Sequence, residues 1–267
     1  MKLKIVPASQ GASWVRSGIR TFFKQPLALS GLFLTFMAAL TLAGLVPFIG
    51  SALALALLPA ATLGFMAATR EAVRGKFPMP TVLISAFRAG RKQMRAMWIL
   101  GALYAAGFLC IMGISALFDG GELARLMLAG GEMSNELIRQ PDFQMAALVV
   151  ASLSMPLSLL FWHAPALVHW HEVPPLKSLF FSIVACLRNW AAFAVYGLAW
   201  CGVVILTGAA VSLIGAAFGG PALAAQLMSP AVLLLSAMFM TSVYFSYLDS
   251  FEAAHEMHLT DPAPPPS

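Results

Sequence analysis

Histidines form the densest group of side chains that could do chemistry in this chain. His163, His169 and His171 lie together at the end of a long apolar run. Successive residues of a helix turn by about 100°, so His163 and His169 are about 120° apart, and His169 and His171 about 160°. A zinc pair on one helix needs residues three or four apart. We therefore predict no metal site here and interpret the cluster as part of an interfacial belt of polar and aromatic side chains.

A second candidate lies near the C-terminus, where Glu252 and His255 make a Glu-x-x-His pair with His258 nearby. Di-iron bundles use that spacing twice, together with two further glutamates, and it occurs once here. We interpret it as a polar helix end. The sequence also has no nucleophile elbow, no phosphate-binding glycine loop and no nucleic-acid motif. These observations predict a protein that is not an enzyme, holds no cofactor or metal and does not bind nucleic acid.

Composition decides the class of protein that must position these residues. Of 267 residues, 60% are hydrophobic and 10% are charged, whereas soluble domains carry about 25% charged residues. Too few charged side chains are present to cover a soluble surface, and disordered chains are polar and highly charged. The three cysteines lie in apolar surroundings without CxxC spacing, so we expect free thiols rather than a disulfide framework. The composition therefore predicts a polytopic membrane protein.

Six apolar runs are long enough to cross a bilayer as helices. They are continuously apolar rather than alternating, which favours an all-α fold over a β-barrel. We predict one six-span membrane domain over residues 1–248 and an acidic, Pro-rich cytoplasmic tail over 249–267. The spans are expected at about 27–46, 51–69, 96–118, 143–164, 191–217 and 222–247.

The distribution of bases predicts the orientation. Of the 16 lysines and arginines, only Arg125 and Arg139 fall between spans three and four; the other fourteen lie on the opposite side. The positive-inside rule then places both termini in the cytoplasm of a bacterial cell, with the protein in the inner membrane. The acidic loop from Asp119 to Asp142 becomes the sizeable extracytoplasmic element, with a short helix expected over Glu122–Leu128.

The cytoplasmic segments share a pattern, in which an amphipathic helix precedes spans one, three and five. Each ends in a base, an amide and an apolar residue, as in Lys24-Gln25-Pro26. Such helices lie at the headgroup layer of a membrane. We expect three hairpins, each preceded by one such helix. Whether these helices lie on lipid or pack together stays open. The basic residues of the third helix could serve only to fix the topology. The predicted contacts to anionic lipid or a partner are Arg16, Arg20, Lys24, Arg88, Arg91, Lys92 and Arg95.

Two stretches carry a family resemblance. They are Met1-Lys2-Leu3-Lys4-Ile5-Val6-Pro7-Ala8 with its continuation to Leu27, and Phe161-Trp162-His163-Ala164-Pro165 with its continuation to Trp190. The chain resembles an uncharacterised family of six-span bacterial inner-membrane proteins, which implies location and topology but no activity. Its layout is more loosely similar to membrane domains attached to some glycerophosphodiester phosphodiesterases. No phosphodiesterase domain accompanies it here, so that activity is not implied.

The leading hypothesis from the sequence is a non-enzymatic inner-membrane protein whose basic helices contact anionic lipid or a cytosolic or membrane protein partner. The alternative is a small transporter or lipid-handling module with substrate between the hairpins, beside Ser154 and Ser158. Spans one to five contain no Asp, Glu, Lys or Arg. Because ion-coupled pumps generally use a buried ionisable residue, their absence disfavours such a pump. The sequence makes no prediction about a homo-oligomer.

Overall fold

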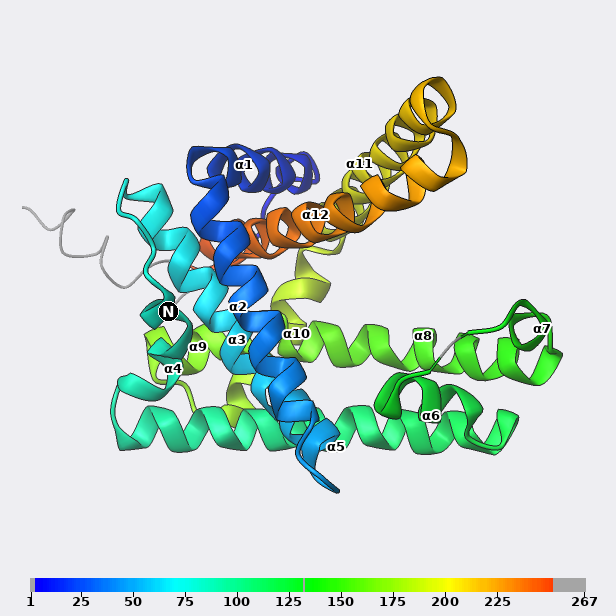
Figure 1. The fold of residues 1–267 in the computed structure, drawn as a ribbon. Coiled ribbons are helices and arrows are strands. Elements are labelled where there is room, and N and C mark those ends of the chain that lie inside the picture. The colour runs from blue at the N-terminus through cyan, green and yellow to red at the C-terminus, as the bar shows by residue number, and fades with distance from the viewer. Residues whose placement is uncertain (1–2, 132, 252–267) are drawn as a thin grey trace, which may run out of the picture. The chain divides into compact units, whose positions relative to one another are not determined.

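The computed structural model describes residues 3–131 and 133–251, and these residues are helical apart from turns and one isolated β-bridge. Within the described residues, six helical segments are long and apolar enough to cross a membrane, which confirms the predicted class (Figure 1). They are α2 (Pro26–Gly44), α3 (Gly50–Val73), α5 (Arg91–Asp119), α8 (Pro141–Phe161) with α9 (Ala164–His171), α11 (Trp190–Phe218) and α12 (Gly220–Ser250). From residue 252 onward, the predicted acidic tail lies outside the described residues, and so do Glu252, His255 and His258.

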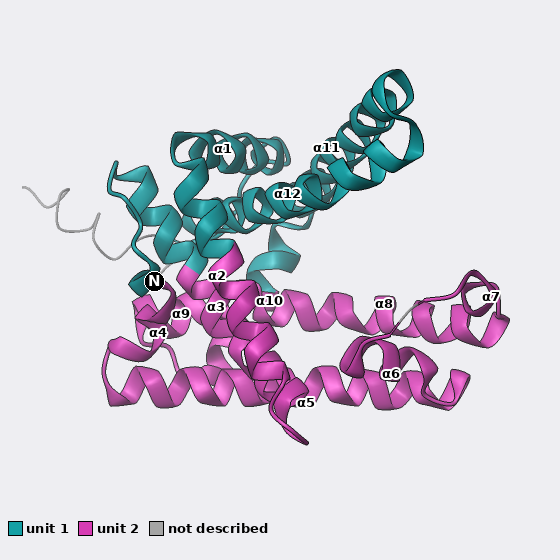
Figure 2. Cartoon of the chain, in the orientation of Figure 1, with its two compact units in different colours: residues 1–33, 65–82, 184–267 teal, residues 34–64, 83–183 magenta. Residues whose placement is uncertain are grey.

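The chain divides into two compact units, each of which is built from separated segments (Figure 2). Unit 1 comprises residues 1–33, 65–82 and 184–267, and unit 2 comprises residues 34–64 and 83–183. The prediction of a single six-span domain and of three repeated hairpins stays a prediction.

In unit 1, the helices α11 and α12 pack against each other, and α1 (Gln10–Lys24) packs against both. The N-terminal segment joins this group, because Leu3 bridges Phe251 and the Lys4 amide donates to the Ser250 carbonyl at 2.9 Å. At 29 and 31 residues, α11 and α12 are each about 45 Å long, which exceeds the roughly 30 Å hydrocarbon core. Each therefore has the length to tilt or to reach beyond the hydrocarbon.

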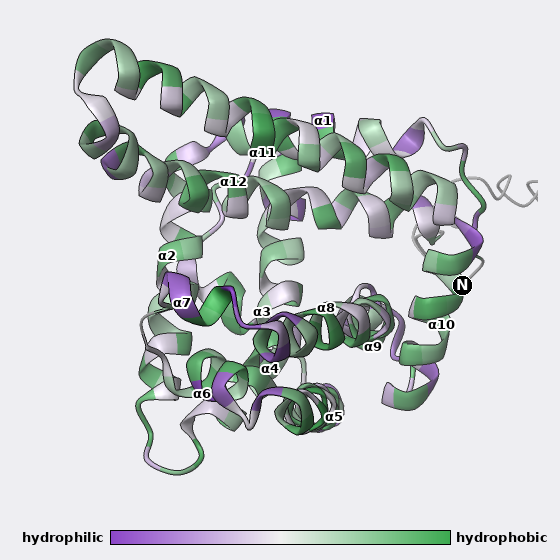
Figure 3. Cartoon of the chain, turned by 90° about the vertical axis from the view of Figure 1, so that its right-hand side faces the viewer, coloured by the Kyte–Doolittle hydropathy of each residue, from purple (hydrophilic) through white to green (hydrophobic). Residues whose placement is uncertain are grey.

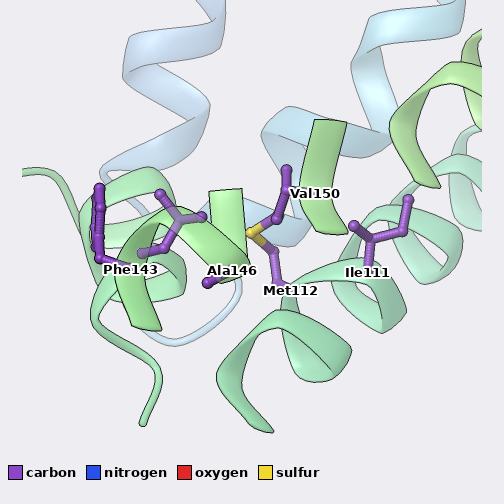
Figure 4. Packing of buried hydrophobic residues seen from close by; sticks show 6 residues of the cluster. Ile111, Met112, Phe143, Ala146 and Val150 are labelled. Atoms are coloured by element: carbon purple, nitrogen blue, oxygen red, sulfur yellow. The ribbon is translucent and has the colours of Figure 1, made fainter. Parts of the chain in front are cut away.

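In unit 2, α5 and α8 lie side by side, with α6 (Glu122–Ala129) against them. Their apolar core joins Ile111 and Met112 of α5 to Phe143, Ala146 and Val150 of α8 (Figure 4). Asp119 starts α6 by accepting hydrogen bonds from the backbone of Gly121 and Leu123 at 2.9 and 2.7 Å. The helix expected over Glu122–Leu128 is thus present, one residue longer. A second, four-residue helix in the acidic loop, α7 (Asn135–Ile138), was not predicted; hydrophilic residues gather around both (Figure 3).

The second amphipathic helix is not continuous, which corrects the sequence prediction. A 3₁₀ turn, η1 (Pro80–Ile84), leads into the four-residue α4 (Ser85–Arg88), and α5 begins only at Arg91. Gly90 breaks the helix with φ of 110°, a value that residues with side chains rarely adopt. Arg88 is therefore separated from the helix that carries Arg91 and Arg95. Those two arginines belong to the first turns of α5, a spanning helix.

Span four, expected over residues 143–164, is interrupted after Phe161, and the helix resumes as α9. Pro165 has no N–H to donate to the Phe161 carbonyl, and α8 ends at Phe161. The hydroxyl of Ser182 enters the gap: it accepts from the His163 amide at 2.9 Å and donates to the Leu159 carbonyl at 2.8 Å. A side chain inserted between a helical donor and its acceptor is a recognised cause of a kink. Ser182 belongs to α10 (Pro175–Arg188), so α10 stabilises the break between α8 and α9.

Candidate membrane-interface site

The first set of predicted contact residues lies on α1, whose two sides differ sharply. Its buried side carries Gly11, Trp14, Val15, Gly18, Thr21 and Phe22. Arg16, Arg20 and Lys24 are exposed, and the 100° helical step places Arg16 and Arg20 on the side opposite Trp14 and Gly18. Phe23 is 64% exposed beside them. The large apolar residues of α1 are thus divided between its two sides, with Val15 and Phe22 buried and Phe23 exposed.

Close packing holds the buried side of α1 on α11 and α12. The Trp14 ring lies 5.3 Å from that of Phe193 and 5.9 Å from that of Tyr196. A Cβ atom added to Gly11 would meet the Ala192 carbonyl oxygen, and one added to Gly18 would meet the Cβ of Ser242. Only glycine allows this approach. The apolar side of α1 therefore contacts protein, which leaves the cationic side facing outward.

Hydrogen bonds fasten the same helix to the end of α12. Asp249 Oδ2 accepts from Gln10 Nε2 at 2.6 Å and from Trp14 Nε1 at 2.8 Å. Bonds to an ionised carboxylate are about twice as strong as bonds between neutral groups. Asp249 was not predicted as a structural residue, yet a signal was present: it is the first charged residue after the apolar stretch from 190 to 248.

Side-chain amides tie neighbouring segments to the ends of these helices. Asn189, which is 2% exposed, accepts from the Val6 amide at 2.9 Å and donates to the Lys4 carbonyl at 3.0 Å. Gln25 donates to the Lys76 carbonyl at 3.0 Å. The repeated base–amide–apolar pattern was a signal for these two contacts. Because Gln25 follows Lys24, it brings the backbone of Lys76, a base absent from the predicted set, next to the end of α1.

The second predicted set lies in unit 2, where Arg88, Arg91, Lys92 and Arg95 are all exposed. Lys92 Nζ contacts Glu172 Oε2 at 3.1 Å, and both side chains are well exposed. Glu172 ends α9 with φ of 53°, a conformation that favours glycine. An exposed ion pair of this kind contributes no more than about 1 kcal/mol. Three bases occupy the first turns of α5, where they face the positive end of its helix dipole.

The predicted histidine cluster is spread over a break in the helix. His163 is fully buried and lies at the gap that Ser182 fills, whereas His169 and His171 are half-buried at the far end of α9. In the part of the chain that the structure describes, no group of three or more His, Cys, Asp or Glu side chains could hold a metal ion. His169 packs edge-on against Trp170, with ring centroids 6.4 Å apart.

Other polar and small residues that were singled out take different positions. Ser154 is half-buried and Ser158 exposed on α8, on either side of Pro156. Gly197 and Gly208 of α11 have nothing within 4 Å of an added Cβ. Close approaches occur at other glycines, among them Gly11, Gly18 and Gly101. Their partners are distant in sequence, so spacing along one helix could not reveal them.

The fold and this charge distribution define a polytopic helical membrane protein. Over 254 residues, covering 94% of both chains, the sequence is 41% identical to a probable inner membrane protein of Burkholderia thailandensis. The chain belongs to the same family of inner membrane proteins, as the resemblance implied, and is an integral, multi-pass protein of the inner membrane. No known protein-family model and no solved structure matches it. The looser likeness to phosphodiesterase-linked membrane domains stays a resemblance of layout.

Proposed function

We propose that the protein is a non-enzymatic component of the bacterial inner membrane that binds anionic lipid headgroups at its cytoplasmic surface. The observation that carries this proposal is the two-sided construction of α1. Its apolar side is packed on α11 and α12, so Arg16 and Arg20 remain exposed on the opposite side. Lys24 lies two residues before the start of α2, a spanning helix. The end of this cationic side is therefore held near the headgroup layer.

The bases of α5 support the same function through their position. Arg91, Lys92 and Arg95 occupy the first turns of a spanning helix, so they lie about where the hydrocarbon ends. Cations at this end of a helix are disfavoured by its dipole, typically by 0.3–1 kcal/mol each. Attraction to an anionic leaflet is worth about 1 kcal/mol per base. Anionic lipid would thus offset the unfavourable placement of these bases.

The distribution of charge supports the cytoplasmic assignment. Fourteen of the 16 bases lie on one side of the predicted topology, and cytoplasmic segments of inner membrane proteins carry such an excess. In this proposal both termini are cytoplasmic, and the acidic loop with α6 and α7 is extracytoplasmic. The lipid ligand is recognised by the phosphate charge of its headgroup, through guanidinium and ammonium donors.

Neutralisation of the cations tests the proposal. The test variant carries Arg16→Gln, Arg20→Gln, Lys24→Gln, Arg91→Gln and Arg95→Gln, and the matched control carries Arg125→Gln and Arg139→Gln in the acidic loop. Both are extracted in native nanodiscs, and the ratio of anionic to zwitterionic lipid is measured by mass spectrometry. We expect wild type and control to be enriched in anionic lipid and the test variant to lose that enrichment. Equal enrichment in all three, with topology unchanged, would overturn the proposal.

A further inference from the structure

The helix α10 exposes its apolar side and buries its small and polar side, which is the reverse of an amphipathic helix in a soluble protein. The large apolar side chains at positions 176, 180, 183 and 187 share one side of α10, and Trp190, the first residue of α11, follows after Asn189. Leu176, Phe180, Leu187 and Trp190 are 70%, 61%, 57% and 69% exposed. We call these four residues, with the half-buried Ile183, the α10 stripe. A soluble helix would bury it.

The opposite side of α10 is small and polar, and it faces the protein. Ser178, Ser182, Ala185, Cys186 and Asn189 are all buried there. Ser182 bridges the His163 amide and the Leu159 carbonyl, and Asn189 holds the backbone of Lys4 and Val6. Rolling the helix to bury its stripe would break these hydrogen bonds and leave buried donors without acceptors. The outward direction of the stripe is therefore fixed by Ser182 at the middle of the helix and by Asn189 just past its end.

Connectivity places α10 at a membrane surface. With 14 residues, it is about 21 Å long, too short to span. Only residues 172–174 separate it from the helix that ends span four, and only Asn189 separates it from span five. Both connected ends lie on the same side of the bilayer, because α10 does not cross. Such short connections cannot carry the helix away from the membrane into bulk water.

Basic residues border the α10 stripe on one flank. Lys177 and Arg188 are both exposed, and their helical positions lie roughly 100–120° from Leu176, between the stripe and the buried side. This order of apolar centre and cationic border is typical of helices that lie in the plane of a bilayer. Further along the chain, α11 also exposes apolar residues such as Leu198 and Leu206.

We propose that α10 is an in-plane membrane helix whose stripe inserts among lipid acyl chains, with Lys177 and Arg188 at the level of the headgroup phosphates. The partner of this surface is the bilayer itself. Insertion of the apolar side chains needs no anionic lipid, so this surface acts independently of the cations on α1 and α5. The inward contact of Ser182 then links the lipid-facing helix to the kink of span four.

Collision accessibility of spin labels tests the proposal in nanodiscs made only of zwitterionic lipid. In a background of Cys110→Ala, Cys186→Ala and Cys201→Ala, single labels are placed by Phe180→Cys and Leu187→Cys on the stripe. Lys177→Cys on the flank and Leu206→Cys in span five are the references. We expect labels at 180 and 187 to collide with oxygen several-fold more than with a water-soluble nickel chelate, as the label at 206 does. The label at 177 should show greater exposure to nickel.

Two results of the spin-label experiment would overturn the proposal. Greater collision with nickel than with oxygen at 180 and 187 would mean that water covers the stripe, and low collision with both reagents would mean that protein covers it. A measurement on the unsubstituted protein guards against a misfolded variant: a lipid-soluble carbene reagent should label the residues of the stripe but not Ser178 or Ser182. Labelling of α11 without labelling of α10 would also contradict it. Loss of anionic-lipid enrichment in the charge variants bears on the proposed function and leaves this result unchanged.

Discussion

Replacing Trp14 by Ala should release α1 from the helices beneath it. Trp14 is 1% exposed, packs against Phe193 and Tyr196 and donates to Asp249 at 2.8 Å. Deleting a buried aromatic side chain typically costs 3–5 kcal/mol. Because each 1.4 kcal/mol is a factor of ten in an equilibrium constant, the opening equilibrium of α1 should rise by at least about a hundredfold.

Hydrogen exchange in lipid nanodiscs measures this opening directly, since protected amides exchange through local unfolding. Amides of Gln10–Lys24 should exchange at least about a hundredfold faster in Trp14→Ala, while those of α5 should be unchanged. Trp14→Phe keeps a ring but loses the donor to Asp249 and should lie between wild type and alanine, because a bond to a charged group contributes about 1.5–3 kcal/mol. Arg16→Ala, on the exposed side, is the matched control. Unchanged exchange of α1 in Trp14→Ala would refute the packed arrangement of this helix.

Four further outcomes follow from particular contacts. Gly18→Leu should displace α1, because its Cβ would meet Ser242, and should accelerate exchange in α1 while Gly31→Leu, in open space, does not. Ser182→Ala leaves the His163 amide without its acceptor and should lower the free energy of unfolding by about 1–3 kcal/mol; a thermal midpoint equal to that of Ser158→Ala would contradict this role. Glu172→Gly should be about 1 kcal/mol more stable than Glu172→Ala, because both lack the carboxylate but only glycine suits φ of 53°. Burial raises the pKa of the Cys186 thiol to about 12, so with Cys110 and Cys201 replaced by Ala a water-soluble maleimide at pH 8 should label it only after denaturation; rapid labelling of the folded protein would show that the thiol is accessible.

Local patterns predicted much of the fold, because span length and continuous apolar character are properties of consecutive residues. The helix of the acidic loop and the outward position of Arg16 and Arg20 also follow from local spacing. The break at Gly90 depends on one backbone angle, and nothing in the alternation of basic and apolar residues marks it. The glycine at position 90, between Arg88 and Arg91, was the one feature of the sequence that could indicate this break.

Contacts between distant segments could not be predicted in this way. Both α1 and α10 show an apolar side in the sequence, yet α1 buries most of its large apolar residues, including Trp14 and Phe22, and α10 exposes its own. The difference lies in what faces each helix: small residues and Ser242 lie beneath α1, whereas the buried side of α10 supplies the hydroxyl of Ser182 to a broken span. The partners are between 19 and 239 residues away along the chain. The partners of Asp249, Asn189 and Ser182 therefore emerged only from the folded arrangement.

The dependence of lipid selectivity on salt tests the central claim most directly. Spin-labelled phosphatidylglycerol and phosphatidylcholine can be compared on the wild-type protein in the same bilayer, from low ionic strength to about 1 M, where the screening length falls to roughly 3 Å. If the exposed bases of α1 and α5 bind headgroup phosphates, phosphatidylglycerol should be preferred at low salt and the preference should disappear at high salt. Equal association of the two lipids at low salt, or a preference that salt does not change, would contradict the proposed function.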